Sequence, residues 1–190
     1  VLSTNWLSHG ELAELFWFGA CVEAFYNNRY FRAFFGFLQK SGRDGFQFFM
    51  DLLALCRKRD FFNRAKTQPL MSEILFQFIS NDPMKGLLQE LLIYDWLRSG
   101  HRFLPEHLGP HQLKQSKDRL WHVLPQELPP FYTHVSRSNF FKQSIFVKFS
   151  GETLQELGLT GGEDGVLCFL NEKENAILEL NKVVLLRNPA

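Results

Sequence analysis

The sequence lacks a strong net charge and any long apolar run. Its 21 Lys and Arg nearly balance its 20 Asp and Glu, which gives a formal net charge of +1. A chain this close to neutral creates no large electrostatic field, so nucleic acid and anionic membrane surfaces are not its default partners. No apolar stretch approaches the roughly 18 residues that a membrane span requires. We therefore expect a soluble protein with no membrane partner.

Cysteine is scarce, and no secretion signal is visible. The chain has only Cys21, Cys56 and Cys168, an odd count with long spacings and no CxxC pair. This pattern is typical of buried thiols in a reducing cytosol, so we expect a cytoplasmic location. The chain begins with Val and its first residues already resemble a helix start, so we also expect it to be part of a longer protein.

Signatures of catalysis and metal binding are also missing. Five of the six His fall between positions 101 and 134, but the pair His107 and His111 is interrupted by Gly109 and Pro110. These residues would break the helix that presents such a pair to one metal ion. Neither HExxH nor GxSxG occurs. The residues therefore predict no metal site and no catalytic residue in this chain.

The stretch GGEDG at 161–165 superficially resembles a phosphate-binding loop. It precedes an expected strand, whereas phosphate binding needs backbone N–H groups that open a helix. Its adjacent acids would also repel phosphate. We interpret it as a turn.

Phenylalanine is abundant, with 21 residues out of 190. Because each aromatic ring buries about 150 to 250 Å², the core is expected to consist largely of rings. Apolar residues recur at helical spacing, with capping patterns such as Ser8 to Glu11 and stop signals such as Gly42 and Gly100. We expect five helices, over about 9–26, 31–41, 46–60, 69–79 and 83–99.

The second half of the chain has a different pattern. Five Pro residues punctuate 105–130, with one further helix expected over 112–123. Alternating or apolar runs then predict short strands over 144–149, 166–170 and 176–180, with another over 182–187. The predicted fold is mainly α: a bundle-like domain of five to six helices with a small C-terminal β-hairpin or sheet. The expected domains are a helical domain (1–108), a Pro-rich wrapping segment (109–135) and a small β tail packed on the helical domain (136–190).

The fifth helix carries a carboxylate between two aromatic residues. Asp95 lies one turn after Leu91 on the apolar stripe, so we expect it to point inward and to need polar partners. One interpretation is a buried clamp that fixes the exit of the helix, and the other is a pocket or interface. The candidate binding or interface residues are Tyr94, Asp95, Trp96, Arg98, His101 and Arg102.

A basic cluster ends the third helix. Arg57, Lys58 and Arg59 either complement the helix dipole on a solvated face or form a nucleic-acid patch, and the near-neutral charge favours the first interpretation. A surplus of aromatic residues exceeds what one face of each helix would bury, so we expect some of them to face another element or another domain, and an exposed surplus would mark an interface. These residues are Trp17, Phe18, Phe25, Tyr30, Phe37 and Phe48.

Three stretches resemble a known family in order and spacing. They are FYNNRYFRAFFGFL, DGFQFFMDLL and LLIYDWLRSGHRFLPEHL. Over about 2–108 the chain resembles the helical C-terminal region (DUF4080) of cobalamin-binding radical SAM proteins of unknown specificity. That resemblance implies a cobalamin-binding domain and a radical SAM barrel upstream in the intact protein.

The resemblance also suggests where the cofactors lie. The chain has neither the CxxxCxxC of the iron–sulfur cluster nor the DxHxxG of the cobalamin ligand. The cluster, S-adenosylmethionine and cobalamin are therefore expected in the upstream part, with no cofactor in this chain. The implied function is that of a non-catalytic accessory domain whose partner is the barrel. The alternatives are a stand-alone module that binds a protein or peptide, or a weak nucleic-acid-binding domain.

Overall fold

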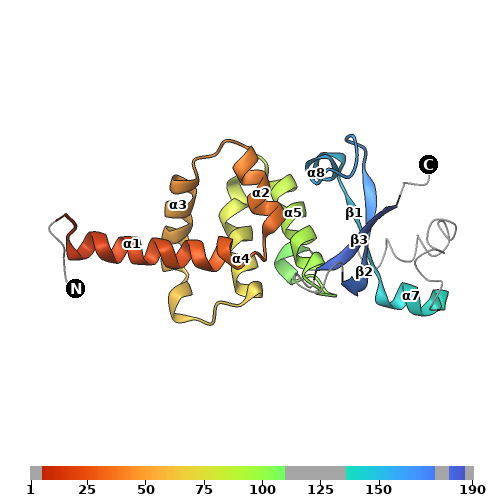
Figure 1. Cartoon of the computed structure of the whole chain (residues 1–190), viewed down its shortest axis with the longest axis horizontal. Coiled ribbons are helices and arrows are strands. Elements are labelled where there is room, and N and C mark those ends of the chain that lie inside the picture. The colour runs from red at the N-terminus through yellow and green to blue at the C-terminus, as the bar shows by residue number, and fades with distance from the viewer. Residues whose placement is uncertain (1–5, 110–135, 174–179, 187–190) are drawn as a thin grey trace. The chain divides into compact units, whose positions relative to one another are not determined.

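The computed structural model describes residues 6–109, 136–173 and 180–186 (Figure 1). These residues form seven α-helices and one three-stranded antiparallel sheet, which confirms a mainly α fold with a small C-terminal sheet. The chain divides into two compact units, Val1–Lys85 and Gly86–Ala190, and each is described by itself. The expected helix at 112–123, most of the Pro-rich segment and most of the strand at 176–180 lie outside the described residues.

The N-terminal unit is helical and follows the predicted order. The first helix ends in a π-helical turn, and two short 3₁₀ turns flank α4. The elements are α1 (His9–Val22), η1 (Glu23–Asn27), α2 (Arg32–Lys40), α3 (Gly45–Lys58), η2 (Phe61–Asn63), α4 (Gln68–Phe78) and η3 (Ile79–Asn81). The first four predicted helices are confirmed to within a few residues.

Local capping explains where these helices begin. The Ser8 hydroxyl accepts a hydrogen bond from the Glu11 backbone N–H, and the Glu11 carboxylate accepts one from the Ser8 N–H at 2.8 Å. Asp44 caps α3, and Thr67 caps α4. Each cap satisfies N–H groups that the first helical turn leaves without partners.

The fifth helix, α5 (Lys85–Arg98), begins later than predicted. Asp82 and Pro83 were expected to open it. Instead, the Asp82 carboxylate accepts a hydrogen bond from the Met84 N–H at 2.8 Å, and the intervening residues form a turn. The same carboxylate also forms a two-point ion pair with Arg43.

Aromatic rings build the core of the N-terminal unit. Phe35 stacks on Phe49 with centroids 5.8 Å apart, and Phe48 meets Phe78 edge to face at 4.9 Å. Phe25, Phe37 and Phe48 belong to the surplus aromatics, and all three are buried because their elements receive neighbours on more than one face. Tyr30, from the same set, is 41% exposed.

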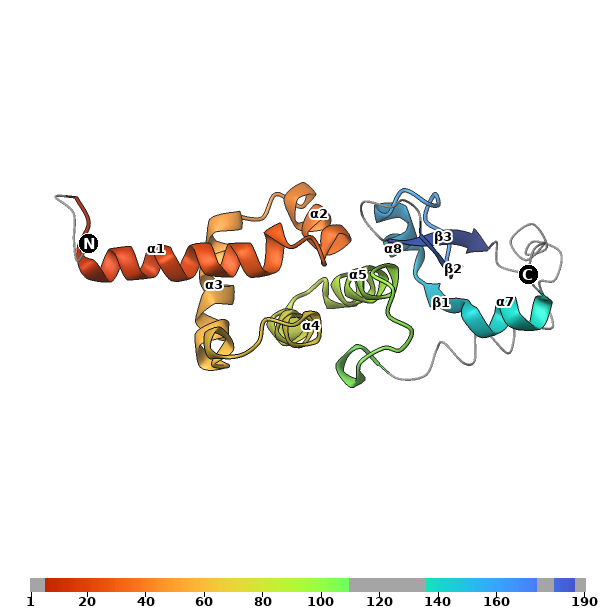
Figure 2. The ribbon, with the colours of Figure 1, turned by 60° about the horizontal axis from the view of Figure 1, so that its bottom comes forward.

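Helix α1 is the exception to this burial. Its apolar stripe was expected to include Leu15 and Phe16, yet these side chains are 53% and 65% exposed. Cys21 is the one residue of α1 that is buried. Figures 1 and 2 show why: α1 crosses α3, and its N-terminal half extends past the other helices of the N-terminal unit.

The C-terminal unit contains most of α5 and the sheet. Two short helices flank β1, and neither was predicted because seven and six residues show little periodicity. The remaining elements are η4 (Glu106–Leu108), α7 (Arg137–Gln143), β1 (Ile145–Phe149), α8 (Gly151–Glu156), β2 (Gly165–Lys173) and β3 (Asn181–Leu186). The strand order is β1-β2-β3, and the predictions for β1, the start of β2 and the last strand are confirmed.

Helices cover both faces of this sheet. Tyr94 of α5 contacts Phe149 and Phe169, which lie on one face, with centroids 6.4 and 5.9 Å apart. Phe141 of α7 stacks on Phe146, on the opposite face, at 5.5 Å. Because side chains alternate between faces, this arrangement buries consecutive residues of β2. The structure therefore groups α5 with the sheet, whereas the expected helical domain ran to residue 108.

Candidate functional site

The candidate residues of α5 lie at its C-terminal end. Asp95 is only 4% exposed, so its predicted inward orientation is confirmed. The helical stripe alone does not explain this, because all residues from 91 to 97 are buried. The Tyr94 hydroxyl accepts a hydrogen bond from the Arg98 guanidinium. These contacts place the aromatic-Asp-aromatic motif inside the packing of the C-terminal unit.

The turn after α5 is fixed by Trp96. Its indole N–H donates to the Phe103 carbonyl oxygen at 2.8 Å, and its ring stacks on His101 with centroids 3.9 Å apart. Burial lowers the pKa of His101, which favours the neutral imidazole at neutral pH. Arg102 donates to the Lys142 carbonyl oxygen at 2.8 Å, which ties this turn to α7. These contacts fix the exit of α5, while the clamp role of Asp95 and a binding role for these residues both stay predictions.

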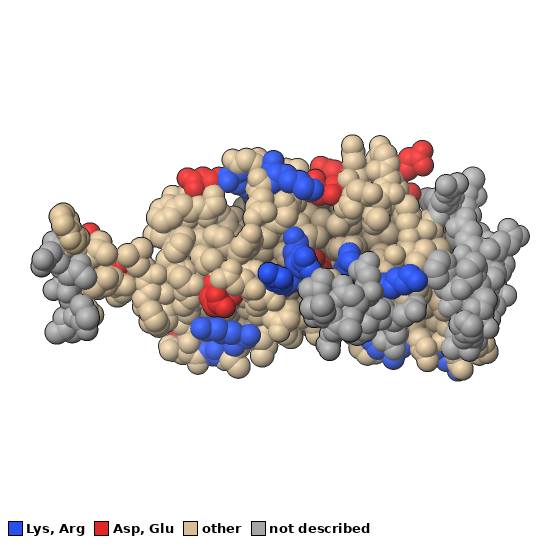
Figure 3. Space-filling view, in the orientation of Figure 1, with Lys and Arg blue, Asp and Glu red and all other residues tan. Residues whose placement is uncertain are grey.

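The predicted basic cluster is partly neutralised by acids. Arg57 pairs with Glu14 at 2.9 Å, and Arg59 pairs with Glu73, while Lys58 is exposed. On the face drawn in Figure 3, basic and acidic atoms lie in small separate groups. The charge available for a phosphate backbone is therefore smaller than three adjacent cations suggest.

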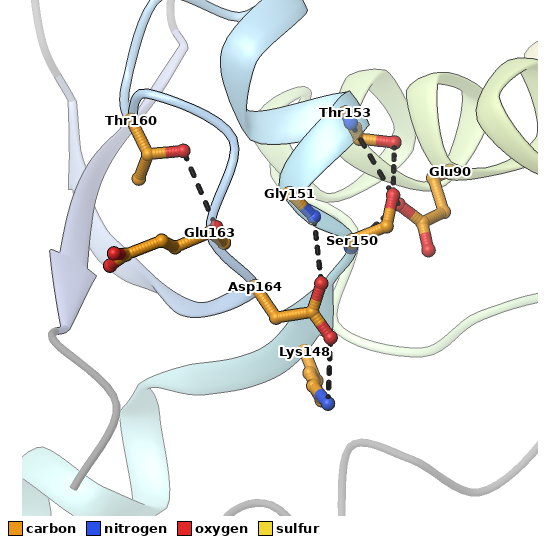
Figure 4. A network of polar contacts seen from close by, with 8 residues as sticks. All are labelled: Glu90, Lys148, Ser150, Gly151, Thr153, Thr160, Glu163 and Asp164. Carbon is orange, nitrogen blue, oxygen red and sulfur yellow. Dashed lines mark hydrogen bonds and ion pairs between the residues drawn. The ribbon is translucent and has the colours of Figure 1, made fainter. Parts of the chain in front are cut away.

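A polar network links α5 to the start of α8 (Figure 4). Glu90 accepts hydrogen bonds from the Ser150 backbone N–H at 3.0 Å and from the Ser150 hydroxyl at 2.7 Å. Ser150 is itself the N-cap of α8 and accepts a hydrogen bond from the Thr153 N–H. The Glu90 carboxylate thus anchors a short helix that has little stability of its own.

The GGEDG stretch forms the turn before β2, as predicted. Gly162 has a φ of +118°, which L side chains rarely adopt. Asp164 accepts a hydrogen bond from the Gly151 N–H at 2.9 Å and pairs with Lys148 at 3.0 Å. The hydrogen bond with Lys148 is the main cause that lowers the pKa of Asp164, and the hydrogen bond from the Gly151 N–H lowers it further. Asp164, one of the two acids that argue against phosphate binding, therefore stabilises the turn.

Sequence reasoning missed two adjoining grooves in the N-terminal unit. The larger has a volume of about 550 Å³ and lies between α1, α2 and α3, where Phe18, Leu38 and Phe46 contribute to its wall. The second has a volume of about 470 Å³ and includes Arg29 and Arg32. A surplus of aromatic residues was the available signal, but only the packing of three helices creates the grooves.

The three thiols are fully buried. A hydrogen bond with Cys21 raises the pKa of Cys56, and burial raises it further. Burial raises the pKa of Cys168 to about 12. A thiol is nucleophilic as its thiolate, so these environments suppress reactivity. Among residues 6–109, 136–173 and 180–186, no group of three or more His, Cys, Asp or Glu side chains could hold a metal ion.

Comparison with known proteins finds one family. A model described as "Protein of unknown function (DUF4080)" matches residues 1–163. The chain belongs to the DUF4080 family. The match extends beyond the expected 2–108 and ends just before β2, so it covers the N-terminal unit, α5, α7, β1 and α8. No curated protein and no solved structure matches the chain.

The structure also bears on membrane insertion of this DUF4080 chain. Within the described ranges, no helix combines the length and the apolar character that a bilayer crossing demands.

Proposed function

We propose that this chain is a non-catalytic accessory region that docks on another protein domain through α1. The observation that carries the proposal is the exposed apolar surface of this helix. Leu15 and Phe16 are 53% and 65% exposed, although α1 is rich in apolar residues. Trp6, just before the helix, is 92% exposed. Leu15 and Phe16 are adjacent in sequence, and large exposed apolar patches mark interaction surfaces.

The fixed half of α1 makes the surface suitable for docking. Near its C-terminal end Cys21 is buried, and Trp17 packs on Phe62 with ring centroids 4.8 Å apart. Glu14 pairs with Arg57 of α3. A rigidly held helix loses little conformational entropy when its exposed half binds a partner.

We further propose that the partner is the barrel of a cobalamin-dependent radical SAM enzyme in the same polypeptide. The family resemblance supports this choice, because membership of DUF4080 is shown and the family's aromatic-Asp-aromatic helix is present at Tyr94, Asp95 and Trp96. On this proposal the iron–sulfur cluster, S-adenosylmethionine and cobalamin belong to the upstream domains. The protein would be cytoplasmic, where the three thiols stay reduced.

The first test is to read the genomic frame upstream of Val1. A CxxxCxxC motif preceded by a cobalamin-binding pattern is the expected result. A stop codon close upstream, with no such motif, would overturn the radical SAM assignment. Purified alone, the chain should neither bind nor cleave S-adenosylmethionine.

The second test addresses α1 directly. The chain and the upstream domains are expressed as separate polypeptides and their binding is measured by titration. Phe16→Asp should weaken binding by about tenfold or more, as expected for an aromatic residue at the centre of an interface. Leu159→Asp, at an apolar residue that is 38% exposed in the C-terminal unit, is the matched control. Equal binding of both variants would exclude docking through α1.

The alternatives predict other results. A stand-alone module would bind a peptide or protein that is not encoded upstream. A nucleic-acid-binding domain would show binding that falls with salt and weakens on Lys58→Gln.

A further inference from the structure

The two grooves of the N-terminal unit have opposite chemical character. The larger groove, of about 550 Å³, is lined mainly by apolar side chains, among them Phe18, Val22, Leu38 and Phe46. Its size falls within the range of about 300 to 1,000 Å³ that is usual for small-molecule sites. Aromatic contacts within the unit hold this wall together: Phe18 lies 5.3 Å from Phe46, centroid to centroid. A ring contact between α1 and α3 therefore helps to shape this wall.

The second groove contains cations. It has a volume of about 470 Å³ and is lined in part by Arg29 and Arg32. Tyr26, Phe35 and Gln39 line both grooves, so the two adjoin. A ligand that filled both would meet aromatic rings at one end and guanidinium groups at the other.

Three of the six arginines of this unit pair with acids, whereas Arg29, Arg32 and Arg64 form no ion pair among the described residues. Arg43, Arg57 and Arg59 each form an ion pair with an acid. Among the described residues, no acidic side chain pairs with Arg29 or Arg32, and both are exposed.

The acid closest to these two arginines in sequence forms its hydrogen bond with another residue. Glu23, the acid closest to Arg29 in sequence, accepts a hydrogen bond from the Asn27 amide at 2.6 Å. Among the described residues, the two guanidinium groups of the second groove therefore have no acidic side chain in ion-pair contact.

A further polar group lies at the junction of the grooves. The Tyr26 hydroxyl accepts a hydrogen bond from the Gln39 side-chain N–H at 2.6 Å. Since a phenol can donate as well as accept, its O–H proton can be directed to a ligand oxygen. The junction therefore offers a donor between the apolar wall and the two guanidinium groups.

We propose that the joined grooves bind a single-chain amphiphile with a phosphate head group. Its apolar chain lies against Phe18, Leu38 and Phe46, and its phosphate binds Arg29 and Arg32. Two guanidinium groups complement a dianionic phosphate better than a carboxylate, because each can offer paired N–H donors to its oxygens. This site is separate from the α1 docking surface, since neither Leu15 nor Phe16 lines either groove.

The test is calorimetric titration of the full chain with four probes. These are inorganic phosphate and three amphiphiles, namely decyl phosphate, decanoate and decyl maltoside, each amphiphile being used below the concentration at which it forms micelles. The expected order is decyl phosphate, then decanoate, then decyl maltoside, with no measurable binding of inorganic phosphate. Equal affinity for decyl phosphate and decyl maltoside, or no binding of either, would overturn the proposal. Binding of inorganic phosphate as tight as that of decyl phosphate would reduce the site to a simple anion site and overturn it too.

Three variants separate the two halves of the site. Arg29 has a φ of +63°, so Arg29→Gly removes the guanidinium and suits the backbone. Arg29→Gly and Arg32→Gln should each weaken decyl phosphate by about tenfold, as expected for loss of a charge-assisted hydrogen bond, and leave decyl maltoside unchanged. Phe46 is 61% exposed in the first turn of α3, where an acid is tolerated, so Phe46→Glu should fold and weaken every decyl probe.

Lys58→Gln is the matched control. Lys58 is an exposed cation of the same unit that lines neither groove. Its loss should leave the affinity for decyl phosphate unchanged, and circular dichroism should confirm that all four variants are folded. If Lys58→Gln weakened binding as much as Arg29→Gly, the attraction would be a general charge effect and the proposed contact would be wrong. Because the joined grooves and the α1 docking surface are proposed to be separate sites, a peptide from the upstream domains should displace no decyl phosphate.

Discussion

Glu90 on α5 accepts both hydrogen bonds that Ser150 can donate, across 60 positions of the chain. The contact fixes the start of α8 against α5, so it joins two elements that the sequence separates widely.

Removing this carboxylate should destabilise the C-terminal unit. Glu90→Ala leaves the Ser150 N–H and hydroxyl without their acceptor, at a cost of about 1 to 3 kcal/mol in free energy of unfolding. Glu90→Gln keeps one acceptor oxygen and should cost less. Urea denaturation measures both values. Glu152→Gln, at an exposed acid of α8, should change stability by less than about 0.5 kcal/mol. A loss in Glu90→Ala no larger than in this control would show that the contact contributes nothing.

Gly151 cannot accept a side chain. A Cβ there would lie 1.8 Å from the Gly162 carbonyl oxygen and 2.9 Å from the Glu163 carbonyl carbon. Both neighbours are backbone atoms of the turn before β2, so they cannot rotate away. Gly151→Ala should therefore lower the free energy of unfolding by about 3 kcal/mol or more.

The same turn supplies the control for Gly151. A Cβ at Gly161 would meet nothing within 4 Å. Gly161→Ala should leave stability within about 0.5 kcal/mol of the parent chain. Amide hydrogen exchange in β1 and β2 would report the difference, and equal protection in the two variants would contradict the close approach at Gly151.

The ion pair between Arg43 and Asp82 should make stability depend on pH in the acid range. The hydrogen bond from Arg43 is the main cause that lowers the pKa of Asp82 below its ordinary value of 3.8. The carboxylate therefore binds protons more weakly in the folded state than in the unfolded state. Its contribution is complete above the ordinary pKa and is lost as the pH falls through the lowered, folded-state pKa.

Arg43→Gln tests this dependence. The variant should lose about 1 kcal/mol of stability at neutral pH, since the pair is only partly buried. As the pH drops below about 4, its stability should also fall less steeply than that of the parent chain. Without Arg43, only the hydrogen bond from the Met84 N–H still lowers the pKa of Asp82, so less stability depends on the ionised carboxylate. Urea denaturation across this pH range provides the measurement. Parallel profiles for the two chains would show that the pair does not set the pKa of Asp82.

The thiols should be unreactive in the folded chain. All three are buried, the pKa of Cys56 is raised by its hydrogen bond with Cys21, and the pKa of Cys168 is raised to about 12. At about pH 8 the thiolate fraction is therefore small, and a disulfide reagent should react slowly until urea unfolds the chain. Comparison with the Cys168→Ser variant shows how much of the reaction with the disulfide reagent comes from Cys168. Rapid reaction of one thiol in the absence of urea would contradict the burial.

The helices of the N-terminal unit were predictable because their determinants are local. The Ser8 to Glu11 capping box and the Phe spacing of α2 act over three or four residues, so the sequence alone reveals them. The turn at Gly161 to Gly165 was likewise predictable from its residue types. By contrast, α7 and α8 are too short to show a period, and contacts with the sheet and α5 hold them.

The inward orientation of Asp95 was predicted from its place on the helix, but the reason proved different. The whole segment from 91 to 97 is buried, so any residue at that position would face the interior. The assignment of most of α5 to the unit that contains the sheet was also not predictable. Its apolar stripe fits a helical bundle equally well, and only Tyr94 against Phe149 and Phe169 assigns it to the sheet.

The sequence by itself therefore determined the helices of the N-terminal unit, the Ser8 cap, the small sheet and a core of aromatic rings, because periodicity and capping depend on neighbours along the chain. The tertiary structure alone decided which aromatic residues remain exposed on α1 and which line the grooves. It also decided that, within the described part of the chain, Arg57 and Arg59 pair with acids whereas Arg29 and Arg32 do not. These features depend on the approach of segments far apart in sequence, and the spacing of residues within one helix does not encode that approach.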